Sequence, residues 1–358
     1  MRLTRKSRWM AGIAAVVIAL GALGYMNRTA VALWGFDVFF KDQVEDKLER
    51  SYQPLKRREA QESAPRSEPM SHEPKQKQKQ KPFTMLLLGV DARGKEQGRS
   101  DTMILSVVRP ADSAMLMVSI PRDTHVEIEG HGGDKITHAY AYGKAELAVD
   151  TVEGLFDVPI DHYASINFLG FKDVIDAMGG IALPIEKDLV NDDPDHEKFV
   201  VKAGQPLYNG NDALNYVRFR EDAGGDSSRT GRHQVFIHAI LDKASEVGQW
   251  TKIPDLIDIM GNNFTTDIRP SATIELAKAM LTGDTRTIHS HTLKGEGKRK
   301  TRGGAWYYYA DEQDLEQSKA MINDWLIAGK ELSELQLPEE AAAKKQQKGL
   351  AAAASAAE

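Results

Sequence analysis

Three short apolar runs, separated by turn-forming and charged residues, constrain the fold of this chain more than any other feature. Residues 85–88 end at Gly89, residues 103–108 follow, and residues 115–120 stop at Pro121. Apolar runs this short, bounded by glycine or proline, are typical of strands that are buried on both faces. The sequence therefore predicts the middle of a buried β-sheet in this part of the chain.

Segments with helical spacing alternate with further short strands along the chain. The expected helices cover residues 144–156, 168–178, 209–217, about 228–246, 253–260, 271–281 and 312–327, and the expected strands cover residues 163–166, 287–293 and 306–309. Such alternation indicates one α/β domain whose central sheet is covered by helices on both faces, as in a three-layer α/β/α sandwich.

The N-terminal segment predicts a single transmembrane helix. Residues 9–26 carry no charge and are just long enough to cross a bilayer. Basic residues precede them at positions 2, 5, 6 and 8, so residues 1–8 are expected in the cytoplasm and the bulk of the chain outside. A cleavable signal peptide with a weak cleavage-like site at residues 29–32 is the alternative, but the apolar segment is long for one.

Two polar regions flank the expected domain, which covers residues 83–328. Residues 27–82 are assigned to an extracytoplasmic stalk, because the polar part from residue 41 to residue 81 is interrupted by four prolines and cannot bury enough surface to fold. Its Lys/Gln run at residues 75–81 could contact anionic wall polymer or lipid, or could be a solvated spacer. Residues 329–358 form a tail rich in Ala and Lys that is expected to be disordered.

The composition excludes several kinds of function. The formal net charge of the 358 residues is −6, so the whole molecule offers no general attraction for nucleic acid or acidic lipid. The chain has no cysteine, which excludes disulfides, thiolate catalysis and cysteine-ligated metals. A local concentration of arginine in such an acidic protein therefore needs a local explanation.

Such a concentration lies between residues 215 and 234. Its charged residues include Arg218, Arg220, Asp222, Asp226, Arg229 and Arg232. If the first two arginines lie on an extended segment, both point to one face. The last two, with His233, fall in register with the apolar Phe236 and Ile240 on a helix that Ser227 or Ser228 could cap. Arginines at a helix N-terminus suit a phosphate or pyrophosphate, whereas a loop of surface ion pairs is the alternative.

Basic and acidic residues also recur where the buried strands stop. They are Asp91 and Arg93, Arg99 and Asp101, Arg122 and Asp123, and Asp134 and Lys135. Each pair alone could be an exposed ion pair of little consequence. In open α/β sheets, however, ligands bind beyond the carboxyl ends of the strands, so these charges would gather in one cleft. A pyrophosphate with Mg²⁺ would satisfy both the arginines and the carboxylates.

These motifs, in this order, resemble the LytR-CpsA-Psr family of bacterial cell-envelope proteins. The resemblance is carried by residues 88–93, 99–102, 119–123, 135–140, 167–171, 179–180 and 216–232, and it covers roughly residues 83–246 with an extension to about 328. The chain departs from the family pattern at Thr137 and His138, where asparagine usually follows Lys-Ile, and at His233, where glutamine is usual. His233 could still donate a hydrogen bond to phosphate, or it could be a partly buried helix histidine.

The resemblance implies an α/β/α domain with a mixed sheet that binds a polyprenyl pyrophosphate carrying a glycopolymer such as wall teichoic acid. It implies transfer of the glycopolymer to peptidoglycan through a phosphodiester, outside the membrane of a Gram-positive bacterium. By position, Mg²⁺ would be held by Asp91 and Asp101, and the pyrophosphate would be gripped by Arg99, Arg122, Arg218, Arg220 and Arg229. The cleft would be completed by Arg93, Asp123, Asp226 and Arg232, which would order the arginines or help to activate the acceptor hydroxyl.

Other functions would use the same residues. A hydrolase of lipid-linked pyrophosphate would replace the acceptor hydroxyl by water, and a non-enzymatic envelope protein would bind or sense the lipid only. Nucleic-acid binding is disfavoured by net charge and topology. Residues 192–196 are read as an exposed acidic loop, because no regular metal-ligand spacing accompanies His196.

A polyprenyl chain would also need an apolar tunnel. The candidate residues, each of which could instead be ordinary core, are Val149, Val152, Leu155, Phe156, Phe168, Phe171, Val174, Ile175, Phe236 and Ile240.

Overall fold

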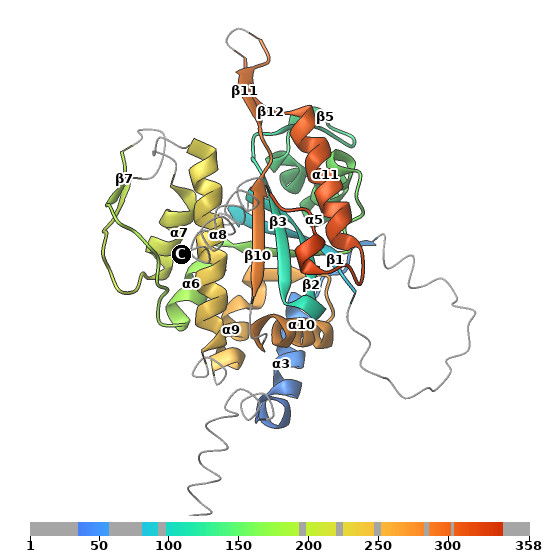
Figure 1. Ribbon diagram of the computed structural model, residues 1–358. Coiled ribbons are helices and arrows are strands. Elements are labelled where there is room, and N and C mark those ends of the chain that lie inside the picture. Colours follow the sequence, from blue (N-terminus) through green and yellow to red (C-terminus); the bar gives the residue numbers. More distant parts are fainter. Residues whose placement is uncertain are drawn as a thin grey trace, which may run out of the picture.

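A six-stranded mixed sheet lies at the centre of the protein (Figure 1). The computed structural model describes residues 35–56, 81–91, 98–192, 198–219, 225–246, 252–282, 286–301 and 304–338. The strand order is β10-β3-β2-β1-β6-β9. The strands are β1 (Phe83–Asp91), β2 (Arg99–Arg109), β3 (Ala114–Ile120), β6 (His162–Asn167), β9 (Phe264–Thr266) and β10 (Thr287–Thr292). This confirms the predicted α/β fold with a mixed central sheet.

The direction of the strands brings several strand ends to one edge of the sheet. Strands β1, β2 and β3 form an antiparallel meander, β6 runs parallel to β1, and β10 runs parallel to β3. The carboxyl ends of β1, β3, β6 and β10 and the start of β2 therefore meet at the same edge. All seven residues of β3 are buried, as expected for a central strand covered on both faces.

Helices cover both faces of the sheet. One face packs against α5 (Thr137–Phe156) and α11 (Glu312–Leu326) through a core that includes Leu86, Val149 and Trp325. The other face packs against α8 (Gly225–Ser245) and α10 (Pro270–Thr282), where Met117 meets Met280. On this second side also lie α6 (Phe168–Ala177), α7 (Gly210–Arg218) and α9 (Ile253–Met260). Helix α5 has non-helical backbone angles at residues 143 and 144, which is where the predicted helix begins.

Part of the region assigned to the stalk folds onto the domain instead. Residues of the segment around α3 (Lys41–Leu48) pack against α9 and α10, and this cluster consists of Phe36, Phe40, Val44, Leu48, Ile253, Ile257 and Ile274. The backbone N–H of Gln53 then donates to the carbonyl of Thr266 on β9 at 2.8 Å. The apolar residues stand at every fourth position, 36, 40, 44 and 48, and so form one stripe of a helix. The prediction missed this stripe because the residues between them are mostly charged or polar.

Replacing Leu48 with alanine is expected to lower the free energy of unfolding by about 2–4 kcal/mol, because this side chain is buried between α3 and its neighbours. Chemical denaturation of the chain measures the change. The matched control is Val38→Ala, since Val38 is 55% exposed on the same segment and its truncation should change stability by less than about 0.5 kcal/mol. Equal effects of the two variants would contradict the docking of α3.

The start of the expected disordered tail is also ordered. The buried Arg109 donates to the carbonyl of Lys330 at 2.7 Å, and the Trp325 indole N–H donates to the carbonyl of Gln336 at 2.8 Å. Leu335 is buried in the core beside α11. Residues up to 338 therefore belong to the domain, and the rest of the predicted tail lies outside the described residues.

In the described part of the chain, three two-stranded hairpins lie around the central sheet, and only the strand at residues 306–309 among them is predicted from the sequence. They are β4 (His125–Ile128) with β5 (Gly132–Lys135), β7 (Leu189–Asn191) with β8 (Phe199–Val201), and β11 (Gly295–Arg299) with β12 (Trp306–Ala310). Short 3-10 helices complete the fold at Glu49–Ser51, Pro110–Asp112, Gly261–Asn263 and Leu332–Glu334.

The predicted transmembrane segment, residues 9–26, lies outside the described residues. Within the part of the chain that the structure describes, no helix combines the length and the apolar character needed to cross a bilayer.

Candidate functional site

A β-bulge places acidic and basic residues at the edge where the strand ends meet. Asp91, the last residue of β1, lies opposite Arg99, the first residue of β2. The register then shifts, so that Val90 pairs with Ser100 and Gly89 with Thr102, which leaves Asp101 as the extra residue on β2. Bulges redirect side chains and are common beside active sites, because the extra residue escapes the regular alternation.

The extra residue pairs with the end of the next strand. Arg122, two residues after β3, donates from its guanidinium to the Asp101 carboxylate at 2.8 Å. A second guanidinium nitrogen of Arg122 lies 3.7 Å from the Asp123 carboxylate. Asp123 in turn accepts from the ammonium group of Lys135 at 2.7 Å. The structure thus connects predicted site residues from three strand ends. The sequence suggested ion pairs between neighbouring residues, but two of these three contacts join residues from different strand ends.

Both departures from the family pattern at the start of α5 have structural partners. The Thr137 hydroxyl donates to the carbonyl of Ser100 at 2.9 Å, which ties α5 to the bulged strand. His138 donates to the Asp134 carboxylate at 2.8 Å, and the Tyr142 hydroxyl donates to the same oxygen at 2.8 Å. Burial raises the pKa of Asp134, but these bonds and one from the Lys135 backbone outweigh it and hold the pKa of this carboxyl below its ordinary value.

The lowered pKa predicts a pH dependence of stability. Because the folded-state pKa is below the unfolded value of about 3.9, ionised Asp134 stabilises the fold above that pH, and the contribution is lost as the pH falls through the folded-state pKa. Asp134→Asn is expected to melt below the unchanged chain at pH 5, with the difference narrowing as the pH is lowered below about 4. Tyr142→Phe should raise the pKa of Asp134 in carboxyl NMR titrations. A melting difference that does not change with pH would contradict this.

Arg218 lies at the C-terminal end of α7 and faces α6. Its guanidinium carbon is 4.8 Å from the ring centre of Phe168, the first residue of α6. Asn167 caps that helix by accepting from the backbone N–H of Gly170 at 2.8 Å. Arg218 is the last residue of α7, so the extended conformation considered from the sequence is wrong at this position.

The buried Arg232 and His233 hold the end of α7 in place. Arg232 donates to the carbonyl of Phe219 and lies 5.3 Å above the ring of that residue. His233 donates from Nε2 to the carbonyl of Val217 at 3.0 Å. The roles predicted for Arg232 and His233 toward the pyrophosphate stay predictions. The two acceptor carbonyls belong to the residues before and after Arg218, so both contacts fix the backbone that carries it.

The remaining predicted residues of the arginine-rich stretch are described only in part. Helix α8 begins at Gly225, so Ser227 and Ser228 lie inside its first turn and the predicted cap at either serine is wrong. Asp226 and Arg229 lie in the same first turns, where the structure describes the backbone only. Arg93, Arg220 and His196 lie outside the described residues.

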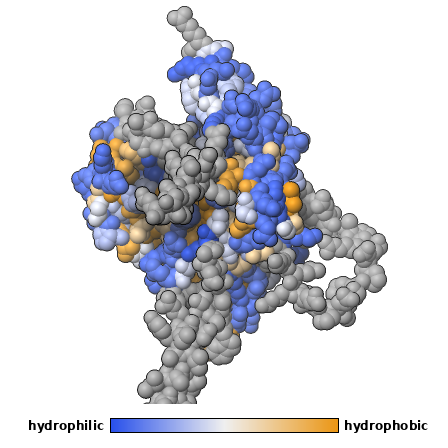
Figure 2. Space-filling view, in the orientation of Figure 1, coloured by the Kyte–Doolittle hydropathy of each residue, from blue (hydrophilic) through white to orange (hydrophobic). Residues whose placement is uncertain are grey.

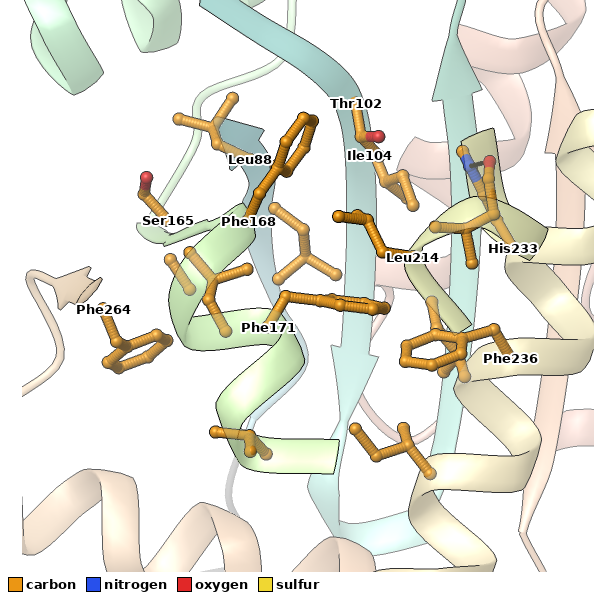
Figure 3. Close-up of a pocket in the computed structure, with 18 of the residues that line it drawn as sticks. Leu88, Thr102, Ile104, Ser165, Phe168, Phe171, Leu214, His233, Phe236 and Phe264 are labelled. Carbon is orange, nitrogen blue, oxygen red and sulfur yellow. Dashed lines mark hydrogen bonds between the residues drawn. The ribbon is translucent and has the colours of Figure 1, made fainter. Parts of the chain in front are cut away.

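An apolar cavity of about 330 Å³ opens beside Arg218 (Figure 3). It lies between the sheet and helices α6, α7 and α8, and at the sheet edge it is lined by Gly89 and Thr102, the register partners next to the bulge. The rings of Phe171 and Phe236 stack inside it, with centres 4.9 Å apart. Its volume lies in the range of small-molecule sites, and its almost wholly apolar lining excludes a polar ligand from the interior.

The cavity separates the tunnel candidates into two groups. Phe168, Phe171, Val174, Phe236 and Ile240 line it. The α5 candidates Val149, Val152 and Phe156 are buried in the core on the opposite face of the sheet, with Leu155 packed against them, and Ile175 belongs to the core around α6 and α7. The second group is ordinary core, as the alternative reading of each residue allowed.

The chemistry of the donor set at the sheet edge fits Mg²⁺. The described residues include no group of three or more His, Asp or Glu arranged to hold a metal. Mg²⁺, however, usually binds through one or two carboxylates together with phosphate oxygens and water. Asp91 and Asp101, on neighbouring strands beside basic residues, supply two carboxylates of this kind.

This chain belongs to the LytR-CpsA-Psr family, because the model of the LytR_cpsA_psr family matches residues 41–324. The match confirms the resemblance predicted from the motifs, and it begins at α3.

Individual relatives agree with this assignment. The chain is 36% identical over 247 residues to the polyisoprenyl-teichoic acid–peptidoglycan teichoic acid transferase TagU of Bacillus licheniformis, with 68% of this chain and 78% of that protein covered. The structure of TagT bound to LI-WTA matches with a TM-score of 0.58 at 32% identity, covering 69% of this chain and 91% of that one. TagT (YwtF) with bound octaprenyl pyrophosphate lipid matches with a TM-score of 0.55 at 28% identity and the same coverage.

Proposed function

We propose that this chain transfers a glycopolymer from a polyprenyl-pyrophosphate carrier to peptidoglycan through a phosphodiester bond. The observation that carries the proposal is an apolar cavity that opens between Arg218 and the bulged strand end, where Asp101 and Arg122 form an ion pair. A lipid pyrophosphate has the same two parts, an apolar chain and an anionic head. The names of TagU and of the lipid-bound TagT structure support the same ligand and reaction for this chain.

The arginines of the sheet edge would stabilise charge during the transfer. A hydroxyl oxygen of the acceptor forms a bond to the phosphorus that carries the glycopolymer, and the bond to the bridging oxygen breaks, so polyprenyl phosphate leaves with the electron pair. Arg99, Arg122 and Arg218 would bind the phosphate oxygens and the leaving group. The acceptor proton would pass to a carboxylate of this edge, where Asp91, Asp101 and Asp123 are the described candidates.

We further propose that Asp91 and Asp101 hold Mg²⁺. When bound, the ion would supply positive charge to the pyrophosphate oxygens, which is the usual requirement of phosphoryl transfer. Arg122, which already contacts Asp101, would orient that carboxylate. Arg220, Arg229 and Arg93 stay predicted anion ligands, and Asp226 stays a predicted orienting residue.

The proposed anchor places this chemistry outside the membrane. Residues 9–26 would span the bilayer with the first residues inside. Along α6 the cavity is lined from the first residue, Phe168, to Val174, and along α8 it is lined from His233 to Ile240. The lipid chain would therefore extend away from the charged sheet edge, toward the end of the domain where α3 lies (Figure 1).

The test uses the full chain in detergent with a lipid-pyrophosphate glycopolymer, peptidoglycan oligomers and Mg²⁺. Glycopolymer linked covalently to peptidoglycan is the expected product. Release of free glycopolymer without linkage would replace the proposal by the hydrolase. Lipid binding without turnover of any kind would favour the non-enzymatic alternative.

A further inference from the structure

A two-stranded hairpin projects from the charged edge of the sheet. Strands β11 and β12 pair along their whole length and form the orange arm of Figure 1. At the middle of β12, the backbone N–H of Tyr308 donates to the carbonyl of Asp123 at 2.8 Å, and Tyr308 forms a β-bridge with Thr124. The arm is thus attached one residue after Arg122, and its orientation relative to the proposed site is fixed by backbone contacts.

One face of the hairpin carries a row of cations and aromatic rings. The Lys298 ammonium group lies 4.7 Å above the ring centre of Tyr309, which stacks on His125 at 5.2 Å. His125 also meets the edge of Tyr307 at 5.1 Å, and the ammonium group of Lys135 lies 5.9 Å from the Tyr307 ring centre. Because Lys135 pairs with Asp123, this row connects the proposed site with the outer part of the arm.

The arm is basic in an otherwise acidic protein. Lys298, Arg299 and Lys300 are all exposed, and Glu296 is the one acidic residue among its described residues 295–301 and 304–310. The whole chain has a formal net charge of −6, so this is a local positive surface, and Figure 2 shows the projection as largely hydrophilic. Aromatic rings flanked by ammonium groups suit a chain that alternates sugar or polyol units with phosphates, because the rings pack against C–H groups and the ammonium groups donate hydrogen bonds to phosphate oxygens.

We propose that this face of the β11–β12 hairpin is a subsite for the glycopolymer of the donor, a phosphate-bearing saccharide or polyol chain. The proposal rests on the proposed function for the identity of the polymer. A membrane surface would also attract cations, but α3, the described element nearest in sequence to the proposed anchor, lies at the opposite end of the domain in Figure 1. The arm therefore extends away from the proposed membrane side.

The test measures binding of poly(glycerol phosphate) to the full chain in detergent by fluorescence anisotropy at several salt concentrations. Lys298→Gln with Lys300→Gln is expected to weaken binding about tenfold and to reduce the slope of log affinity against log salt by about 1–2. The slope falls because a variant with fewer cations displaces fewer counterions from the polymer when it binds. Arg299 is left unchanged, since it donates to the carbonyl of Gly304 at 2.7 Å and closes the turn. The matched control, Lys187→Gln with Lys202→Gln, removes two exposed lysines at the β7–β8 hairpin and should bind as the unchanged chain does.

Assays with two donor substrates distinguish a failure of this subsite from a failure of the proposed function. With a long anionic glycopolymer the hairpin variant should raise KM about tenfold, and with a lipid pyrophosphate carrying a single sugar its kinetics should equal those of the unchanged chain. Equal losses with both donors, or equal losses in the control variant, would overturn the subsite. Loss of binding to anionic vesicles with polymer binding unchanged would overturn it in favour of a membrane contact. If polymer binding depends on the hairpin but no donor gives linked product, the subsite stands and the proposed transfer fails.

Discussion

Replacing Arg218 with alanine is expected to lower the rate of glycopolymer transfer by about 100- to 1,000-fold, the loss typical when one group that stabilises transition-state charge is removed. Arg218 is the one arginine among the described residues that line the cavity, and the head of a bound lipid would lie beside it. Its guanidinium lies over the Phe168 ring and forms no ion pair with a carboxylate of the described residues. Its charge would therefore be available to the proposed ligand, and the fold should lose only about 1 kcal/mol of cation–π stabilisation.

Transfer assays with purified variants test this expectation. Arg50→Ala, at an exposed position near α3, is the matched control and should keep full activity. Arg218→Lys should recover only part of the rate, because an ammonium group cannot bind phosphate in a bidentate manner while stacking on Phe168. Full activity of Arg218→Ala, at an unchanged melting temperature, would remove Arg218 from the proposed site.

Asp101→Asn is expected to lower transfer by about 100-fold or more, for two reasons that act together. The substitution removes the charge that pairs with Arg122, and it removes one of the two carboxylates proposed to hold Mg²⁺. Binding of Mn²⁺ in the presence of a polyprenyl pyrophosphate, followed by the EPR signal of the free ion, should weaken in parallel. This measurement does not depend on turnover.

Two further variants distinguish the loss of the ion pair from the loss of a metal ligand. Arg122→Gln removes the partner but keeps the Asp101 carboxylate, so it should slow transfer while Mn²⁺ still binds. Asp112→Asn breaks an Arg–Asp pair at the opposite end of the same strands, where Asp112 lies 2.7 Å from Arg109, and it should leave transfer unchanged. If Asp101→Asn binds Mn²⁺ as tightly as the unchanged chain, Asp101 is not a metal ligand.

The sheet and its covering helices were predictable because their signals are local. Residues 85–88, 103–108 and 115–120 are apolar runs between turn residues, and each lies within a strand of the structure. The site was predictable for a similar reason, since charged residues directly after buried strands must lie at the sheet edge. Asp101 and Arg122 form the pair that this placement implies, although they are 21 positions apart in the sequence.

Other features depend on contacts that no short sequence window contains. The bulge that makes Asp101 the extra residue is a matter of register between β1 and β2. The roles of Arg232 and His233 follow from where α7 ends, because each donates to a carbonyl near that end. The apolar stripe of α3 was visible in the sequence, but its partners on α9 and α10 come more than 200 residues later.

The docking of α3 limits how far the domain can reach from the membrane. If residues 9–26 span the bilayer, only residues 27–34 separate them from the first described residue, and eight fully extended residues reach at most about 29 Å. Residues 57–80, which include most of the Lys/Gln run, are flanked in sequence by the buried Leu55 and by β1, so they add nothing to this tether. The α3 end of the domain would then lie within about one bilayer thickness of the membrane, and the charged sheet edge would face peptidoglycan from the far end of the domain (Figure 1).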